Sequence, residues 1–291
     1  MRSLLFVPGD DPRKITKGLA GEADALLLDL EDSVSLARKP EARRIVAEHL
    51  AANAGAAKTL IVRVNALDTG LTDDDLDGVM AGAPVAILLP KCRSGADVAH
   101  LAAKLAVREA EHALPDGSTQ IIALATETAG ALFNMGSYAG CNHRLTGVTW
   151  GAEDLAADLG AEDNRLESGT YTDPYRLARA LTLFAAAAAG VPAIDTVYPN
   201  FRDLEGFRAE TEAGRRDGFT AKMAIHPGQV PIINAVFTPS AEAVAHAEAV
   251  VAAFAGNPEA GVVAIDGAMV DRPHLRQAER ILARAAVAKG I

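Results

Sequence analysis

The sequence is poor in cysteine and in long apolar stretches, and both shortages exclude classes of protein. The chain of 291 residues has two cysteines, Cys92 and Cys141, too few for a disulfide scaffold, an iron–sulfur cluster or a cysteine-rich zinc module. No stretch approaches the roughly 18 uninterrupted apolar residues of a membrane span, and the first apolar segment is too short for a signal peptide. We therefore expect a soluble, cytoplasmic protein with no membrane partner, in which both cysteines are ordinary side chains.

Basic residues are also in the minority. Lys and Arg total 28 against 38 Asp and Glu, which gives a formal net charge of −10. A general nucleic-acid-binding protein needs a basic face, so the composition argues against that class, although a few local Arg and Lys can still bind an anionic substrate. Hydrophobic residues make up 49% of the chain, which is enough to bury a sizeable core.

Short apolar segments recur along the chain, and each ends at a polar or charged cluster. They lie at 4–7, 25–30, 60–64, 85–89, 121–125, 147–150, 193–197 and 221–225. Such segments are typical of parallel strands that are covered on both faces. Helical periodicity at 40–53, 96–112, 174–189 and 204–214 alternates with them. The pattern predicts an α/β fold, a (β/α)8 TIM barrel, whereas the rival open sheet lacks its usual Gly-x-Gly-x-x-Gly after the first strand.

The chain continues beyond the predicted barrel. We expect the catalytic barrel in residues 1–235 and a C-terminal helical segment in 236–291, with helices at 240–254 and 273–288. The stretch 257–270 is rich in Gly and Pro, so we expect a loop-like hinge there. The last helix carries a basic stripe and an apolar stripe, and its apolar stripe needs a partner, either its own barrel or a neighbouring chain. These stripes consist of Arg276, Arg280 and Arg284, and of Leu275, Ala278, Ile281 and Leu282.

Polar residues follow the predicted strands, and in a barrel these strand ends share one face, where active sites lie. They are Glu31, Asp32, Arg63, Lys91, Glu127, Asp154 and His226. Any single one is open to a simpler reading as a helix cap or a surface ion pair. As a set, they predict an active site at the carboxyl ends of the strands.

Glu127 and Asp154 are 27 residues apart, about one βα unit, so they are expected at the ends of neighbouring strands. Mg2+ prefers one or two carboxylates completed by water and substrate oxygens, so this pair predicts a magnesium site. The alternative for Asp154 is a cap of the following helix. Zinc is disfavoured because no pair of histidines has the spacing of zinc ligands.

Arg63 and His226 each leave two interpretations open. Arg63 lies within the apolar strand Ile-Val-Arg-Val-Asn, where a charge must be paired, so it either pairs with a core carboxylate or binds an anionic substrate. His226, in Ala-Ile-His-Pro-Gly, is either a hydrogen-bonded structural residue or a catalyst.

Several motifs in this order resemble the citrate lyase β-subunit-like (HpcH/HpaI aldolase) family over essentially the whole chain. They are Arg-Ser-Leu-Leu-Phe-Val-Pro-Gly at the start, Leu-Asp-Leu-Glu-Asp-Ser-Val at 28–34, Val-Arg-Val-Asn at 62–65, Leu-Pro-Lys at 89–91, Glu-Thr-Ala-Gly-Ala-Leu at 127–132, Gly-Ala-Glu-Asp-Leu at 151–155 and Ile-His-Pro-Gly-Gln-Val at 225–230. The resemblance implies a (β/α)8 barrel with Mg2+-dependent cleavage of carbon–carbon bonds in 3-hydroxyacyl-CoA esters.

The resemblance also implies roles for particular residues. Glu127 and Asp154 match the metal ligands of the family, and Arg63 matches its substrate-binding arginine. Gly267-Ala-Met-Val-Asp271 is similar to a C-terminal motif whose aspartate is the acid/base of malyl-CoA and citramalyl-CoA lyases and is contributed by a neighbouring subunit. Asp271 is also a fair N-cap for the last helix. Arg93 departs from the acidic residue that many relatives carry there, and a contact with a CoA phosphate is one reading of it.

The expected function is therefore a Mg2+-dependent lyase that releases acetyl-CoA or propionyl-CoA and an oxoacid from an acyl-CoA substrate. Arg63, Glu31, Asp32 and Lys91 are expected to bind the substrate, with Arg63 and Asp271 as the catalytic residues. The alternatives are a thioesterase or a malate-synthase-like activity at the same site, and a citrate lyase β subunit that acts on an acyl carrier protein. We expect a homo-oligomer, a trimer or a hexamer, with Asp271 completing a neighbour's site.

Overall fold

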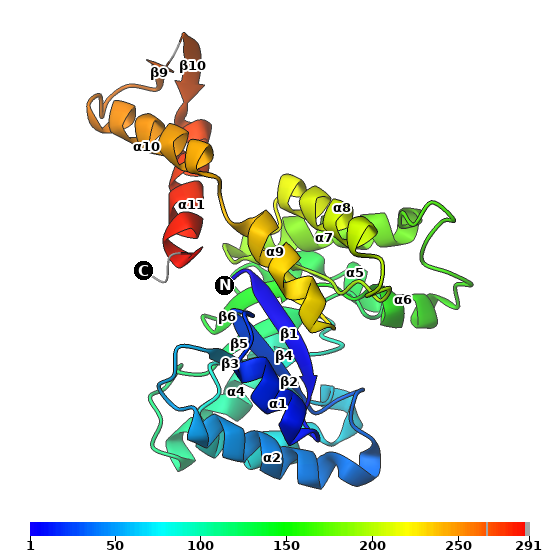
Figure 1. The fold of residues 1–291 in the computed structure, drawn as a ribbon. Helices are drawn as coiled ribbons and strands as arrows, with labels where there is room; N and C mark the ends of the chain where they lie inside the picture. Colours follow the sequence, from blue (N-terminus) through cyan, green and yellow to red (C-terminus); the bar gives the residue numbers. More distant parts are fainter. Residues whose placement is uncertain (266, 289–291) are drawn as a thin grey trace.

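Eight parallel strands close into a barrel in the computed structural model, which describes residues 1–265 and 267–288 (Figure 1). The strands follow chain order, and β8 pairs with β1 to close the ring. Each strand lies within two residues of an apolar segment of the sequence, which confirms the TIM barrel and excludes the open sheet. The strands are β1 Ser3–Pro8, β2 Ala25–Asp29, β3 Thr59–Arg63, β4 Ala86–Leu89, β5 Gln120–Leu124, β6 Leu145–Thr149, β7 Ala193–Asp195 and β8 Ala221–Ala224.

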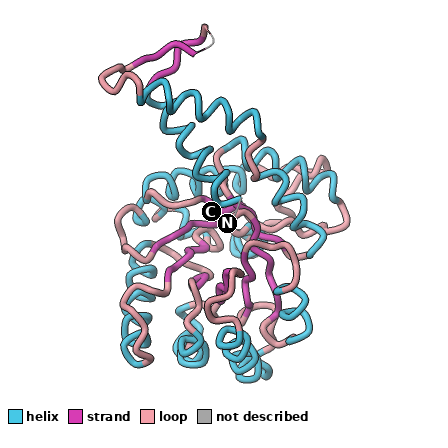
Figure 2. Tube along the Cα trace, turned by 60° about the vertical axis from the view of Figure 1, so that its left-hand side comes forward, coloured by secondary structure: helices cyan, strands magenta, loops and turns pink. Residues whose placement is uncertain are grey.

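Helices connect the strands and cover the outside of the barrel (Figure 2). The four periodic segments of the sequence are α2 Lys39–Ala52, α4 Gly95–Glu111, α7 Asp173–Ala189 and α8 Leu204–Asp217. Five shorter helices were not delimited from the sequence, although the one that contains Asp154 was anticipated. Each has eight residues or fewer, which is too short to show a clear helical period. They are α1 Pro12–Leu19, α3 Thr72–Val79, α5 Ala129–Leu132, α6 Ala152–Leu159 and α9 Val230–Phe237. No helix within the described residues is both long and apolar enough to cross a membrane.

Alternate residues of each strand face two separate cores. The inner core fills the barrel with side chains such as Leu27, Ile61 and Met223, and the outer core packs residues such as Leu26 and Val62 under the helices. Strands buried on both faces give the continuous apolar segments seen in the sequence. The inside of the barrel is therefore packed and not a pore, and the place where barrels of this kind carry their active sites is the carboxyl end of the strands.

A buried ion pair closes the amino-terminal end of the barrel, where β5 and β6 begin. Arg144 donates to both carboxylate oxygens of Glu109 at 2.7 Å, and Glu109 also accepts from the backbone N–H groups of Gly117 and Thr119. Although burial opposes ionisation, these donors lower the pKa of Glu109 to about 2. This cluster satisfies its own charges.

The C-terminal segment contains a β-hairpin, so the prediction of a loop-like hinge at 257–270 was wrong. After α10 (Ala241–Ala255), strands β9 (Val262–Ile265) and β10 (Ala268–Asp271) pair antiparallel and lead into α11 (Arg272–Ala288). Short, largely exposed strands between Gly and Pro lack the apolar signal that marks the barrel strands. The hairpin projects away from the barrel in both views (Figures 1 and 2).

The apolar stripe of α11 packs against α10. Ala278 belongs to a small core with Val250 and Phe254 of α10, and Leu275, Ile281 and Leu282 pack against it. The partner of this stripe therefore lies within the segment itself, and neither the barrel nor another chain is needed to cover it.

Candidate active site at the carboxyl ends of the strands

A cavity of about 440 Å³ opens at the carboxyl-terminal end of the barrel. One part of its wall is apolar, with Phe6, Leu124, Trp150, Val197 and Met223, and the other part is charged. The charged part contains Asp29, Asp32, Arg63, Glu127, Glu153 and Asp154. The polar residues that follow strands β2, β3, β5 and β6 thus meet in one pocket, as the sequence predicts for this face.

Arg63 is held against the pocket wall by a buried carboxylate. Its Nε and Nη2 donate to the two oxygens of Asp29 at 2.7 and 2.8 Å, and its Nη1 lies 2.8 Å from Glu31 Oε2. The guanidinium carbon lies 4.8 Å from the centre of the Phe6 ring. The two readings of Arg63 are therefore compatible, because the side chain pairs with a core carboxylate and still lines the pocket.

Asp29 is a pocket residue that the sequence reasoning left out. It is the last residue of β2 and lies directly beside Arg63 in the strand register. Its oxygens also accept from the backbone N–H groups of Glu31 and Ser33 at 2.9 and 3.1 Å. Burial opposes ionisation of Asp29, but the hydrogen bonds and the charge of Arg63 lower its pKa. The only signal in the sequence was the position of Asp29 at the end of an apolar segment, the same kind of position that singled out the other polar residues.

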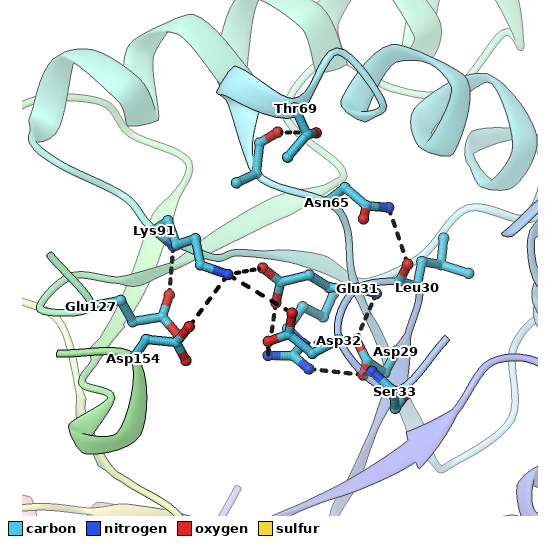
Figure 3. Close-up of polar contacts among 12 residues, drawn as sticks. Asp29, Leu30, Glu31, Asp32, Ser33, Asn65, Thr69, Lys91, Glu127 and Asp154 are labelled. Carbon is cyan, nitrogen blue, oxygen red and sulfur yellow. Dashed lines mark hydrogen bonds and ion pairs between the residues drawn. The ribbon is translucent and has the colours of Figure 1, made fainter. Parts of the chain in front are cut away.

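Lys91 links three acidic side chains across the pocket (Figure 3). Its Nζ lies 2.8 Å from Glu31 Oε1, 3.4 Å from Asp154 Oδ1 and 3.9 Å from Asp32 Oδ1. Its backbone N–H donates to Glu127 Oε2 at 2.6 Å. The backbone of Lys91 is left-handed, with φ of 48°, a conformation that L-residues rarely adopt. A strained residue at a pocket fits a functional arrangement, because this turn aims both the amide and the ammonium at the acidic cluster.

Glu127 is buried among negative charges. Only 3% of its surface is exposed, and burial, followed by the charges of Asp154 and Glu31, raises its pKa well above the usual value. Gly151 makes room for it, because a Cβ at this position would lie 2.9 Å from Glu127 Cγ. The protein thus holds a carboxylate where it is poorly stabilised, next to a second carboxylate.

Asp154 lies in the first turn of α6 and is partly exposed to the pocket. The N-cap of α6 is Gly151, and the side chain of Asp154 pairs with Lys91, so Asp154 is not the helix cap. The described residues contain no group of three or more His, Cys, Asp or Glu arranged to hold a metal. Two carboxylates that face a pocket nevertheless fit Mg2+, which takes its remaining ligands from water and substrate.

Three residues singled out in the sequence lie outside this cluster. His226 stacks on Phe201 and accepts from the backbone N–H of Gly228 at 3.1 Å, which agrees with a structural role. Arg93 pairs with Asp97 on the surface. Burial raises the pKa of Cys92 to about 12, so its thiol is unreactive near neutral pH.

Asp271 ends β10 on the projecting hairpin. Its Oδ1 accepts from the backbone N–H of His274 at 3.4 Å and contacts the imidazole of His274, an arrangement that caps the start of α11. Asp271 does not line the pocket of its own chain, and the hairpin that carries it projects away from the barrel (Figure 1).

Comparison with known proteins agrees with this arrangement. The profile of the HpcH/HpaI aldolase/citrate lyase family matches residues 2–227. The chain belongs to this family. The citrate lyase subunit beta of Leuconostoc mesenteroides subsp. cremoris is 35% identical over 97% of this chain and 92% of its own length. A (3S)-malyl-CoA thioesterase of Cereibacter sphaeroides is 38% identical over 98% of this chain and 94% of its own length.

A solved structure extends the likeness to a liganded family member. The CitE protein of Mycobacterium tuberculosis, in complex with magnesium, acetoacetate and coenzyme A, superposes with a TM-score of 0.76. The two chains are 34% identical, and the match covers 98% of each. This chain thus belongs to an enzyme family in which at least one member binds magnesium and coenzyme A.

Proposed function

We propose that this family member is a Mg2+-dependent carbon–carbon lyase that cleaves a 3-hydroxyacyl-CoA ester of the malyl-CoA, citramalyl-CoA or citryl-CoA type. The products are acetyl-CoA or propionyl-CoA and an oxoacid. One observation carries the proposal: Glu127, Asp154 and the braced Arg63 face one cavity of about 440 Å³. A cavity of this size is in the range of small-molecule sites.

Glu127 and Asp154 would hold the magnesium ion. When bound, the ion supplies a Lewis acid that polarises the substrate's oxygens. The repulsion between the two carboxylates favours this role, because a divalent cation is the partner that their charges lack. Gly151 supports the same role by leaving space for the Glu127 side chain.

Arg63 would stabilise the negative charge that develops on the thioester oxygen as the carbon–carbon bond breaks. Asp29 occupies Nε and Nη2, so the guanidinium is already oriented before substrate binds and loses little freedom on binding. Lys91 would pair with a substrate carboxylate, while Glu31 and Asp32 hold the Lys91 ammonium at the pocket edge.

Asp271 would act in the pocket of a neighbouring subunit, where it exchanges a proton with the acetyl carbon or the hydroxyl group of the substrate. Its place on a hairpin that projects from its own barrel supports this reading. The proposal requires a homo-oligomer, and we favour a trimer or a hexamer of chains that each lend their C-terminal segment, 236–291, to the next barrel.

Two relatives support second candidates. The 38% identity to a malyl-CoA thioesterase favours hydrolysis of the thioester at the same site. The 35% identity to a citrate lyase subunit beta favours a subunit that acts on an acyl carrier protein.

Product analysis separates these functions. Purified protein with Mg2+ is incubated with malyl-CoA, citramalyl-CoA and citryl-CoA, and the products are identified by mass spectrometry. Acetyl-CoA together with an oxoacid is the expected result. Free CoA with an intact hydroxy acid would establish the thioesterase. Turnover only of substrates carried on an acyl carrier protein would establish the subunit role.

A further inference from the structure

A second cavity, of about 360 Å³, lies between the barrel and the C-terminal segment. Its walls come from α8, from the end of α9 and the linker that follows it, from the start of α10 and from α11. The lining residues with charged side chains are Arg208, Glu212, Arg215 and Arg284. Arg2, just before β1, donates to Thr238 of this wall at 2.8 Å, so the cavity lies beside the start of β1 and away from the pocket at the strand ends.

Two of the three arginines that line this junction cavity have no carboxylate partner among the described residues. Arg208 reaches only Glu212, at 4.0 Å, and no described carboxylate lies within ion-pair distance of Arg215 or Arg284. Arg284 Nε is buried without a hydrogen-bond partner. Elsewhere on this acidic chain, Arg144 and Arg179 each pair with two carboxylates.

The unpaired charges also repel one another. Burial, and then the charges of Arg215 and Arg280, lower the pKa of Arg284. The helix α10 begins at the same cavity, where the Oγ of its N-cap, Ser240, accepts from the backbone N–H of Ala243. The partial positive charge of a helix N-terminus adds to the excess of positive charge. An anion would therefore be stabilised at this place by several groups at once.

We propose that the junction cavity is a binding site for a small polyanion with two or more phosphate or carboxylate groups. The planar fork of each guanidinium suits such oxyanions, and the volume of the cavity matches a small metabolite. The bound anion bridges α8 of the barrel and α11 of the C-terminal segment. It thereby ties the segment that carries Asp271 to the barrel. The site does not depend on the reaction at the strand ends.

The test is a calorimetric titration of the full chain with inorganic pyrophosphate in the presence of EDTA, which keeps divalent cations out. Wild type is compared with Arg215→Gln, Arg284→Gln and Arg216→Gln. Arg216 is the matched control, because it is an exposed neighbour on α8 that does not line the cavity, and its loss changes the net charge by the same amount.

We expect one pyrophosphate per chain in wild type and in Arg216→Gln. The affinity falls at least about tenfold in Arg215→Gln and in Arg284→Gln, because each loses a charged hydrogen bond. Equal weakening in all three variants, or no binding to wild type, would overturn the proposal.

Hydrogen exchange provides a second readout that does not depend on α11 keeping its place. Pyrophosphate is expected to slow exchange in the 238–243 linker and first turn of α10 in wild type and in Arg216→Gln, but not in Arg215→Gln. Protection at the strand-end pocket instead would place the anion in the active site and reject the junction cavity. Sedimentation at several protein concentrations follows assembly of the chains. Loss of pyrophosphate binding as the chains assemble would mean that a second copy fills the cavity, and would likewise reject the proposed site.

Discussion

The two ends of the barrel carry two buried charge clusters of opposite character. At the amino-terminal end, Glu109 and Arg144 satisfy each other, and the pKa of Glu109 falls to about 2. At the carboxyl-terminal end, Glu127 is equally buried, but its neighbours include two more carboxylates and its pKa rises. The first cluster is complete without a ligand, whereas the second has an excess of negative charge that faces a pocket.

This contrast separates stability from function on one scaffold. A buried carboxylate paired with its own arginine contributes to folding, and removing either partner leaves the other as an unpaired buried charge. A buried carboxylate held beside other carboxylates opposes folding, and its retention is explained by something that binds. The same substitution at the two ends should therefore have opposite consequences.

The largest effect on stability is expected for Glu109→Gln. The substitution leaves the buried Arg144 with the exposed Asp116 as its one described carboxylate partner, so the free energy of unfolding should fall by about 3 kcal/mol or more. Turnover per folded molecule should not change, because the site lies at the far end of the barrel. Urea unfolding measures the loss of stability, and kinetics on the same sample measure the turnover per folded molecule. A stable but inactive variant would contradict the division of roles.

The matched change at the other end, Glu127→Gln, should reduce Mg2+-dependent turnover by about 100-fold or more, comparable to about 3 kcal/mol. The amide removes a proposed metal ligand, yet its oxygen can still accept from the N–H of Lys91, so the fold should keep its stability or gain some. Kinetics over a range of Mg2+ concentrations, with urea unfolding as the control, measure this. Full activity at limiting Mg2+ would reject the metal assignment.

Acid should weaken the amino-terminal cluster in a defined range. Because the pKa of Glu109 is lowered from an ordinary 4.5 to about 2, its contribution to stability is fully present above about pH 4.5 and is lost as the pH falls toward 2. In Glu109→Gln this part of the decline should be missing, so the stability curves of the two proteins should converge in acid. Parallel curves would show that other groups dominate acid unfolding.

Arg63→Lys should reduce turnover by about 10- to 100-fold. Lysine keeps the charge but cannot bind both oxygens of Asp29 and still present a planar donor to the pocket. Asp29→Asn is the companion variant. It keeps Arg63 but weakens its brace, so turnover should fall less than in Arg63→Lys while the KM for the acyl-CoA rises. If Asp29→Asn has wild-type kinetics, Asp29 does not position Arg63.

The sequence predicts the strands of the barrel better than it predicts the details of the site around them. The barrel strands are predictable because burial on both faces leaves continuous apolar segments, and neighbouring strands bring Glu127 and Asp154 to one pocket. The role of Asp29 depends on its register beside Arg63, which the sequence does not show. The left-handed turn at Lys91 has no glycine to mark it.

The C-terminal segment is the part that the sequence describes least well. Its hairpin strands are four residues long and mostly exposed, so they resemble a Gly-rich loop. The apolar stripe of α11 was correctly recognised, but its partner α10 could not be chosen over the barrel or another chain from periodicity alone. Both failures concern contacts between elements, which a local pattern does not record.

The smallest expected signal comes from mixing two inactive variants, Asp271→Ala and Arg63→Ala. If each active site takes Arg63 from one chain and Asp271 from its neighbour, random mixed oligomers contain both wild-type residues in about a quarter of their sites. Activity should therefore rise from near zero to about a quarter of wild type. Subunit exchange is followed independently, by native mass spectrometry of isotope-labelled chains, and a mixture of Asp271→Ala with Glu127→Gln serves as a second complementing pair. An Arg63→Ala and Glu127→Gln mixture is the matched control, because both changes lie in the same barrel and no site can recover. Exchange without recovered activity in the first two mixtures would show that Asp271 is not shared between subunits, and would leave it as the cap of α11.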